Sequence, residues 1–544
     1  MTGRVRAPEL HGAGGWINTD CPLSIEGLRG RVVLLDFWTF CCINCLRVVE
    51  ELRPLERRFG DRLVVIGVHS PKFVHESDHA AVEQAVRRHR IEHPVLDDPE
   101  MEMWQLYGVR AWPTLVVIDP DGYVVGMASG EGNGEALADV IENLLAGKEA
   151  PAGAAFTSTP PEKGGPLSFP GKVAVAPDGR LAIADTGHDR VLITDSAGRV
   201  ERTLDGFSQP QGVRFDGERL LVCDTVAGTL VAVDLQSDQR TVLASGMHSP
   251  WDVVVAPDAS LVVAEAGLHR LLRVPRDGGD FQVLAGTRAE GLRDGPATGA
   301  HLAQPSGLTV LHDGAIAIAD SEVSALRVLR DGAMTTLVGH GLFDFGATDG
   351  DGRTARLQHP LGVAALPHGR IAVADTFNSL LRLWRDGTLS TVKLGEPLNE
   401  PGGLDLAADG AVIVADTNNH RVLRVDLQTG AVSPLHIGWQ DAVASELRGA
   451  HGGVVRVRVD VHGVDGHLDS SDGPPVRVTI SAEPATLIGA GARTWALEEV
   501  PATLEVRLGS AGTGVLAVDI TAATCTDDVC TIVKEMHRHP LVVE

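Results

Sequence analysis

The sequence has few basic residues for the number of acidic ones, and this shortage narrows the choice of partners. Its 544 residues include 47 lysines and arginines against 72 aspartates and glutamates, a formal net charge of -25. Such a charge repels phosphate backbones and anionic membrane surfaces, and it favours solubility. We therefore expect neither nucleic acid nor a membrane as a partner.

Long hydrophobic runs and cysteines are also scarce. Residues 1–18 contain no apolar stretch of signal-peptide length, and no other segment reaches the roughly 18 apolar residues of a membrane-spanning helix. Seven cysteines are too few for a secreted disulfide scaffold of this length. We predict a cytoplasmic protein, in a reducing compartment where a CxxC pair is more often catalytic or metal-binding than structural.

The length of the chain allows several hydrophobic cores, and changes of character along it predict three domains. A linker rich in Pro, Gly, Ala and Thr separates an α/β region from a repetitive β region, which a third, β-rich region follows. We expect an α/β domain at 1–148, a linker at 149–166, a repeat domain at 167–440 and a β-sandwich at 441–544.

Three of the seven cysteines lie in the segment CCINC at residues 41–45, directly after the apolar run 32–38. This order places Cys42 where a strand would lead into a helix. Unpaired backbone N–H groups and the helix dipole stabilise a thiolate at a helix N-terminus. Cys45 lies one turn further on, where its thiol could resolve a mixed disulfide. The spacing predicts a redox pair.

The first 148 residues alternate between strand and helix patterns, which indicates an α/β fold. Residues 45–59 have the apolar spacing of an amphipathic helix, kinked at Pro54. The predicted strands are 32–37, 63–68, 114–118 and 123–127.

This region resembles the thioredoxin-like family. In that family a cis-proline loop faces the CxxC pair, and the Trp-Pro-Thr sequence at 112–114 matches it, which makes Pro113 the expected cis residue. The resemblance further implies that Cys42 attacks, Cys45 resolves the mixed disulfide and the buried Asp36 takes the proton of Cys45. Cys41 stands where the family usually has Trp, and we expect it to tune or branch the reaction.

The motif CCINC together with HSPKF at 69–73 is more specific, and it resembles the NHL repeat-containing protein 2 family. Consistent with that resemblance, six units of about 40 residues follow the linker, each with short β-rich runs around a turn. The segments 184–191 and 414–422 look like NHL repeats, and the implied architecture is a six-bladed β-propeller. Each unit opens with a proline and has an acidic residue 14 or 15 positions later: Pro170 and Asp185, Pro210 and Asp224, Pro250 and Glu265, Pro305 and Asp320, Pro360 and Asp375, and Pro401 and Asp416.

We interpret the repeated acidic residue as structural, capping turns between strands, because blade geometry explains a residue that every blade requires. Metal catalysis at these residues and at the repeated histidines is the weaker alternative. Insertions at 291–295 and 348–352 precede two of the units, and loops of this kind often line a binding face. The acidic loop 349–352 lacks the rest of an EF-hand, so we expect a solvated loop and no calcium site.

The last hundred residues show strand alternation, as at 455–461, which suggests a small β-sandwich. Cys525 and Cys530 flank a four-residue turn, and opposite positions in a hairpin lie near disulfide-bonding distance. The segment resembles weakly the cysteine hairpin of thiol:disulfide interchange proteins. A second redox pair that exchanges with Cys42 and Cys45 is one hypothesis, and two ordinary reduced cysteines are the other.

Zinc is the main rival chemistry for Cys42 and Cys45, because histidines follow them and His75 and His79 could share a helix face. No second CxxC completes a four-ligand site, so we expect no metal and no cofactor. The sequence predicts a thiol-disulfide oxidoreductase whose propeller binds a partner protein and whose redox partner is a protein or a small thiol. The runner-up is a non-catalytic scaffold with a vestigial redox domain, and peroxide reduction fits the motif less well.

Overall fold

The computed structural model describes residues 4–148, 165–439, 447–459, 467–468, 476–489, 491–497, 502–525 and 530–543. The chain divides into two compact units, and each is described by itself. The first contains Met1–Pro161, Phe169–Val191 and Leu204–Pro434, and the second contains Glu162–Ser168, Leu192–Thr203 and Leu435–Glu544. None of the helices in the described ranges is both long enough and apolar enough to cross a membrane.

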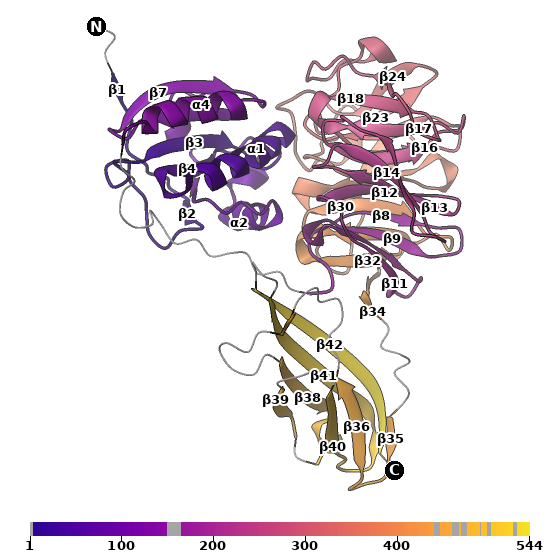
Figure 1. Ribbon diagram of the computed structural model, residues 1–544. Helices are drawn as coiled ribbons and strands as arrows, with labels where there is room; N and C mark the ends of the chain where they lie inside the picture. The colour runs from indigo at the N-terminus through magenta and orange to yellow at the C-terminus, as the bar shows by residue number, and fades with distance from the viewer. Residues whose placement is uncertain are drawn as a thin grey trace. The chain divides into compact units, whose positions relative to one another are not determined.

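The N-terminal part of the first unit is a seven-stranded sheet with helices on its faces (Figure 1). The strand order is β1-β7-β6-β3-β4-β5-β2, with β3 in the middle, parallel to β4 and antiparallel to β6. The strands are β1 Val5–Arg6, β2 Gly15–Ile17, β3 Val32–Trp38, β4 Leu63–His69, β5 Val95–Asp97, β6 Thr114–Ile118 and β7 Tyr123–Ser129. The helices are α1 Ile43–Phe59, α2 His79–Arg88, α3 Glu102–Leu106 and α4 Gly134–Leu145. This is the predicted α/β pattern, with Pro54 inside α1.

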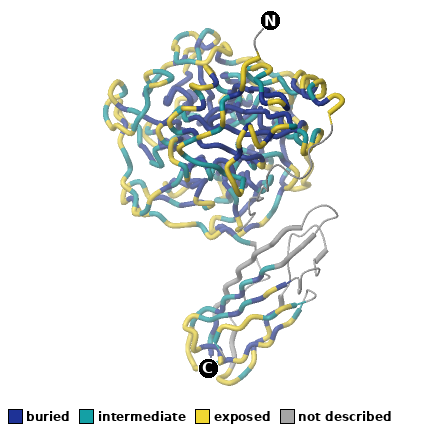
Figure 2. The backbone as a smooth tube through the Cα atoms, turned by 90° about the vertical axis from the view of Figure 1, so that its left-hand side faces the viewer, coloured by how far each residue is buried: buried dark blue, intermediate teal, exposed yellow. Residues whose placement is uncertain are grey.

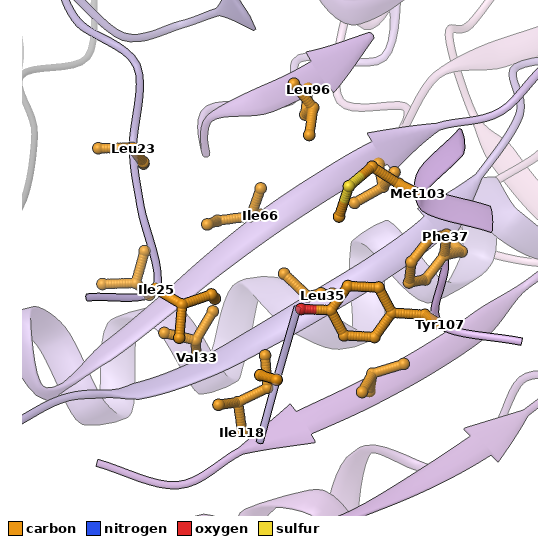
Figure 3. Packing of buried hydrophobic residues seen from close by; sticks show 14 of the residues in the cluster. Leu23, Ile25, Val33, Leu35, Phe37, Ile66, Leu96, Met103, Tyr107 and Ile118 are labelled. Carbon is orange, nitrogen blue, oxygen red and sulfur yellow. The ribbon is translucent and has the colours of Figure 1, made fainter. Parts of the chain in front are cut away.

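Strand β3 is buried along its whole length, and its alternating side chains divide between two cores. Val33, Leu35 and Phe37 pack on one face with residues such as Ile66 (Figure 3). Val32 and Leu34 face the other way, into the core formed with α1 and α4. Asp36 falls in this second alternation, so the pleat directs its side chain to the face that α1 covers.

The next part of the chain is an all-β, propeller-like region built from six sheets (Figure 1). Each of the six sheets has one edge strand, called its first strand, that contacts the equivalent strand of the next sheet. The last of these strands, β30, contacts β8, so that the six form a closed ring. These first strands are β8 Pro170–Val175, β12 Pro210–Asp216, β16 Pro250–Val255, β21 Pro305–Val310, β26 Gly362–Ala365 and β30 Pro401–Leu406. Buried residues concentrate on the strands of the first unit and exposed ones at its loops (Figure 2).

The remaining strands of these sheets follow in chain order. They are β9 Leu181–Asp185, β10 Arg190–Thr194, β11 Arg199–Leu204, β13 Arg219–Asp224, β14 Thr229–Asp234, β15 Arg240–Ala244, β17 Leu261–Glu265, β18 Arg270–Val274, β19 Gln282–Ala285, β20 Gly295–Pro296, β22 Ile316–Asp320, β23 Ala325–Arg330, β24 Ala333–Val338, β25 Gly350–Asp351, β27 Ile371–Asp375, β28 Leu380–Arg385, β29 Thr388–Thr391, β31 Val412–Asp416, β32 Arg421–Val425, β33 Val432–Leu435 and β34 Gly438–Trp439.

The repeated prolines and acidic residues are cross-strand partners. Pro210 pairs with Asp224, Pro305 with Asp320, and three further sheets show the same pairing. In the fifth sheet the first strand begins two residues after Pro360. The periodic signal in the sequence therefore marks one end of an antiparallel strand pair, where the first strand begins and the second strand ends.

The repeated acidic side chains cap backbone N–H groups, which confirms the structural interpretation. Asp320 accepts a hydrogen bond of 2.7 Å from the backbone N–H of Ala303, and Asp375 accepts one of 2.7 Å from that of Gln358. Asp224, Glu265 and Asp416 accept the equivalent bond. The residue between the capped amide and the proline has a positive φ in every repeat. These six residues are Phe169, Gln209, Ser249, Gln304, His359 and Glu400.

An acidic residue of each insertion in the repeat region binds a buried arginine. Asp349 accepts a hydrogen bond of 2.8 Å from Arg382, and Asp294 accepts one of 2.9 Å from Arg327. Both guanidinium groups are fully buried and also pair with the repeated acid of their own sheet, Asp375 or Asp320. Each acidic loop is thus held by an ion pair to an arginine in a strand of its own sheet.

The second unit contains two sheets that share one hydrophobic core. The smaller sheet pairs β36 Val454–Val459 with β40 Ala502–Arg507, and the larger has the order β35-β42-β41-β38-β39. Its strands are β35 Leu447–Gly449, β38 Val476–Glu483, β39 Arg493–Leu497, β41 Gly512–Cys525 and β42 Cys530–Val543, and β37 His467–Leu468 pairs with β41. The backbone register places Cys525 opposite Cys530, but their side chains lie outside the described residues, so the predicted pair stays a prediction.

Candidate active site

Cys42 occupies the N-cap of α1, directly after the buried strand β3 and its connecting turn. Its φ and ψ are -82° and 103°, and its Sγ accepts a hydrogen bond of 3.2 Å from the backbone N–H of Cys45. At this position a thiolate gains from the unpaired N–H groups and from the helix dipole. The structure therefore places Cys42 at a helix N-terminus, where a nucleophilic thiolate is stabilised.

Cys45 and Asp36 are both fully buried behind Cys42. Burial raises the pKa of Asp36 to about 7, although the nearby His93 opposes the shift. Burial also raises the pKa of Cys45 well above its ordinary value, and the charges of Cys42 and Asp36 raise it further. Neither carboxylate oxygen of Asp36 has a hydrogen-bond partner among the described residues. A carboxylate with a pKa near neutrality, coupled to a protonated thiol, suits the transfer of one proton.

The Trp112–Pro113 peptide bond is cis, as the sequence predicts. Thr114 pairs with Phe37 in the sheet, so the register places Pro113 beside the end of β3, where the cysteine segment begins. The indole Nε1 of Trp112 donates a hydrogen bond of 3.0 Å to the carbonyl oxygen of Ser70. The sheet thus brings Pro113, which is distant in the sequence, to the strand end that leads from Asp36 to the cysteines.

Glu76 is a site residue that the sequence analysis did not predict. Its side chain is fully buried. One carboxylate oxygen accepts hydrogen bonds of 2.6 Å from the hydroxyl of Thr39 and 2.8 Å from the backbone N–H of Cys41. The other accepts from the backbone N–H groups of Lys72 and Phe73, each at 2.9 Å. Glu76 therefore holds the turn before Cys42 against the segment that follows β4.

His75 and His79 do not share a helix face, so that part of the zinc alternative is wrong. His75 lies in the short 3₁₀ helix Val74–Ser77, and His79 begins α2. Their rings bind different carboxylates, Glu400 for His75 and Asp97 for His79. No group of three metal-ligating side chains suited to an ion occurs in the part of the chain that the structure describes.

The propeller-like region covers the cysteine segment. The side-chain oxygen of Gln304 accepts a hydrogen bond of 3.1 Å from the backbone N–H of Ile43, the first residue of α1. The ring of Phe377 packs on that of Phe40 with centroids 5.3 Å apart. Cys42 is left only 7% exposed. The proposed nucleophile thus lies in a contact between two parts of one compact unit.

Ion pairs fix this contact. Glu400 is 1% exposed in its side chain and accepts hydrogen bonds of 2.6 Å from Arg88 and 2.8 Å from His75. Burial by itself would raise the pKa of Glu400, but the Arg88 charge and the bond from His75 outweigh burial and lower it to about 2. A further pair, Arg90 with Asp189 at 2.6 Å, is more exposed. Glu400 and Gln304 both hold the repeat position just before a proline.

Glu322 brings a second buried carboxylate of the propeller-like region to the cysteines. Its Oε1 lies 3.8 Å from the Sγ of Cys41 and also accepts a hydrogen bond from the ammonium of Lys72. Burial raises the pKa of Glu322 to about 7 in spite of Lys72. A cavity of about 50 Å³ reaches Cys41, and one of about 220 Å³ runs beside α1 between Leu46 and Trp251.

Two protein families match parts of this chain. The thioredoxin-like family matches residues 30–124, and the NHL repeat family matches residues 398–424.

Proteins that resemble the chain over longer or shorter spans were also found. NHL repeat-containing protein 2 of Gallus gallus is 34% identical over 525 residues, which covers 79% of this chain and 71% of the chicken protein. Protein SUPPRESSOR OF QUENCHING 1, chloroplastic, of Arabidopsis thaliana is 34% identical over 501 residues and covers 79% of this chain and 47% of the plant protein. Thiol-disulfide oxidoreductase YkuV of Bacillus subtilis is 24% identical over 143 residues, 26% of this chain and 95% of that protein. With its thioredoxin-like domain, its NHL repeats and this degree of identity, the chain belongs to the NHL repeat-containing protein 2 family.

Proposed function

We propose that the protein is a thiol-disulfide oxidoreductase that works through Cys42 and Cys45. The observation that carries the proposal is the position of Cys42 at the N-cap of α1, where its sulfur accepts the N–H of Cys45. A thiolate at this place can attack a disulfide, and a second thiol one turn on can complete the exchange. The name of the Bacillus subtilis relative, a thiol-disulfide oxidoreductase, supports the same chemistry for this domain.

The exchange has two steps. In the first, the Cys42 thiolate attacks a disulfide of the partner, whose S–S bond breaks and releases one partner thiolate. In the second, Asp36 takes the proton of Cys45, and the Cys45 thiolate attacks the Sγ of Cys42. The mixed disulfide breaks, the second partner thiol leaves, and Cys42 and Cys45 are joined. Two electrons pass to the partner, and a reducing thiol returns the pair to its dithiol form.

The proposal also covers the architecture of the β-rich domains and the cellular location of the protein. We propose that the six sheets form the blades of a propeller that binds a protein partner, and that the C-terminal sheets form a β-sandwich. The closed ring of first strands and the shared core of the C-terminal sheets support these assignments. The scarcity of cysteines supports a reducing compartment, and we propose the cytoplasm.

Equilibration in a graded series of reduced and oxidised glutathione tests the function, with every disulfide mapped by mass spectrometry. The wild-type protein is compared with Cys42→Ser and Cys45→Ser variants. We expect a reversible Cys42–Cys45 bond in the wild type. In Cys45→Ser we expect a mixed disulfide of Cys42 with glutathione that persists. If no bond that involves Cys42 forms at any ratio, the oxidoreductase proposal fails.

A non-catalytic scaffold is the second candidate, and the cover over Cys42 favours it. Gln304 and Phe377 lie against the segment that carries the proposed nucleophile, which leaves Cys42 7% exposed. A scaffold needs no reversible disulfide, so the same glutathione series separates the two candidates. A protein that binds its partner equally well with Cys42 and Cys45 both replaced by Ser would support the scaffold.

The hairpin that joins β41 and β42 remains a candidate second redox pair. Its backbone register, with Cys525 opposite Cys530, supports a bond between them. In the Cys42→Ser variant, a trapped bond from Cys45 to either residue would establish an internal relay. Full exchange activity in a variant with Cys525 and Cys530 both replaced by Ala would show that these cysteines take no part in the exchange.

A further inference from the structure

Cys41 has a charged environment that differs from that of Cys42. Its Sγ lies 3.8 Å from the Oε1 of Glu322, and both side chains are almost fully buried. The same oxygen accepts a hydrogen bond from the ammonium of Lys72. Glu322 follows the second strand of the fourth sheet, 281 positions from Cys41 along the chain. The thiol therefore faces an acid supplied by the propeller-like region.

The other charged groups around this contact come from several elements. Glu76 lies on the Cys41 side and accepts the backbone N–H of Cys41 itself. Glu290 lies 3.7 Å from the ammonium of Lys72, and the Nδ1 of His359 lies 3.6 Å from the Oε2 of Glu322. Lys72 is a cation that acts on Cys41, and its ammonium pairs with both Glu322 and Glu290.

We propose that Glu322 keeps the Cys41 thiol protonated and so confines disulfide exchange to Cys42 and Cys45. A carboxylate at hydrogen-bonding distance accepts the proton of a thiol and repels a thiolate. Cys42 has the opposite surroundings, because its sulfur accepts an N–H at the start of α1. The propeller-like region thus keeps the Cys41 thiol unreactive, while the adjacent Cys42 thiol can react.

The direction of the pKa shift agrees with this geometry. Burial raises the pKa of Cys41 well above its ordinary value, the charges of Glu322 and Glu76 raise it further, and Lys72 opposes them. Burial lowers the pKa of Lys72, but Glu322, Cys41 and Glu290 together outweigh burial, and the net pKa is raised. Neutralising Glu322 would remove the repulsion and leave the ammonium free to stabilise a Cys41 thiolate.

The test measures the pH dependence of alkylation at each cysteine separately. Wild-type protein and a Glu322→Gln variant react with iodoacetamide from about pH 7 to about pH 12, and mass spectrometry gives the rate at each site. We expect the midpoint of the Cys41 profile to fall by about one pH unit or more in Glu322→Gln. A midpoint that stays the same or rises would overturn the proposal.

Two control variants separate electrostatics from loosening of the contact. A looser contact raises the alkylation rate at every pH but leaves the midpoint in place. Glu290→Gln removes a nearby charge that does not touch Cys41, and we expect a smaller shift than in Glu322→Gln. Lys72→Met removes the cation, and we expect the Cys41 midpoint to rise. A midpoint that falls in Lys72→Met would contradict the proposed roles.

The selection of Cys42 rests on the proposed exchange function, whereas the protonation of Cys41 does not. In the glutathione series we expect Cys41 to form a mixed disulfide in Glu322→Gln and to stay reduced in the wild type. Absence of any Cys42–Cys45 bond, with the Cys41 midpoint still lowered in Glu322→Gln, would reject the exchange function alone. A normal Cys42–Cys45 bond with no change at Cys41 would reject the role of Glu322 alone.

Discussion

The side-chain oxygen of Gln304 accepts a hydrogen bond of 3.1 Å from the backbone N–H of Ile43, so a residue of the propeller-like region closes the first turn of the helix that carries Cys42. The N–H groups of this turn are also what stabilises a thiolate at Cys42. Gln304 and the sulfur of Cys42 therefore both accept backbone N–H groups of the first turn of α1. A change at Gln304 should thus alter the reactivity of the Cys42 thiol.

A Gln304→Glu substitution tests this connection. It places a carboxylate near the N-cap, and a like charge disfavours the thiolate. We expect the rate of Cys42 alkylation at neutral pH to fall by about tenfold, because less of the thiol is present as the reactive thiolate.

Gln209 offers the matched control, because it holds the same repeat position before Pro210 and also has a positive φ. We expect Gln209→Glu to leave Cys42 almost unchanged. An equal slowing in both variants would indicate a general effect of charge and would refute a specific contact.

Arg88→Met should open the contact over Cys42. Glu400 would keep its buried negative charge with His75 but lose its guanidinium partner. Removing one partner of a buried pair typically costs about 3–5 kcal/mol. We expect a lower midpoint in denaturant and faster alkylation of Cys42.

The control for Arg88 is Arg90→Met, which breaks the more exposed pair with Asp189. Exposed pairs contribute about 0–1 kcal/mol. If the two variants lost equal stability and exposed Cys42 equally, the Arg88–Glu400 pair would have no special part in the contact.

Asp36→Asn should slow the second step of exchange and stabilise the fold in alkaline solution. Burial raises the pKa of Asp36 from 3.8 to about 7, so ionising it costs stability as the pH rises through this range. A neutral Asn has no such cost. We expect a gain in unfolding free energy of up to about 4 kcal/mol above pH 7, and a gain close to zero near about pH 4.

Kinetics provide the second measurement for Asp36→Asn. Without the base, release of the partner from the mixed disulfide should slow by about 10²-fold, while the first attack by Cys42 stays fast. Equal slowing of both steps would argue for a structural effect and against proton transfer.

The sequence predicts the parts of this site that depend on local signals. The apolar run of β3, the amphipathic pattern of α1 and the position of Cys42 between them all have short-range periodicities. The repeated prolines and acids likewise mark real strand pairs, because every repeat forms the same pairing of its first two strands.

The cover over the cysteines does not follow from such signals. Gln304, Glu322 and Glu400 meet α1, Lys72 and Arg88 across 250 to 312 positions of the chain, and no periodicity encodes pairings at that distance. Gln304 and Glu400 also fall at a repeat position whose side chain differs from one repeat to the next. That variability, beside a constant proline, is the signal that could have singled them out.

Glu76→Gln gives the sharpest test of how the turn before Cys42 is held. The carboxylate accepts four hydrogen bonds, from the hydroxyl of Thr39 and the backbone N–H groups of Cys41, Lys72 and Phe73. An amide replaces one acceptor oxygen with an NH₂ group that faces two of these donors. Bonds to a charged acceptor are worth about 1.5–3 kcal/mol each, so we expect a loss of about 3 kcal/mol or more in denaturant unfolding. Glu83→Gln on the exposed side of α2 is the control, with an expected change under about 0.5 kcal/mol. Because the turn sets the place of Cys42, Glu76→Gln should also slow formation of the mixed disulfide, and normal exchange in a destabilised variant would show that Glu76 supports the fold alone.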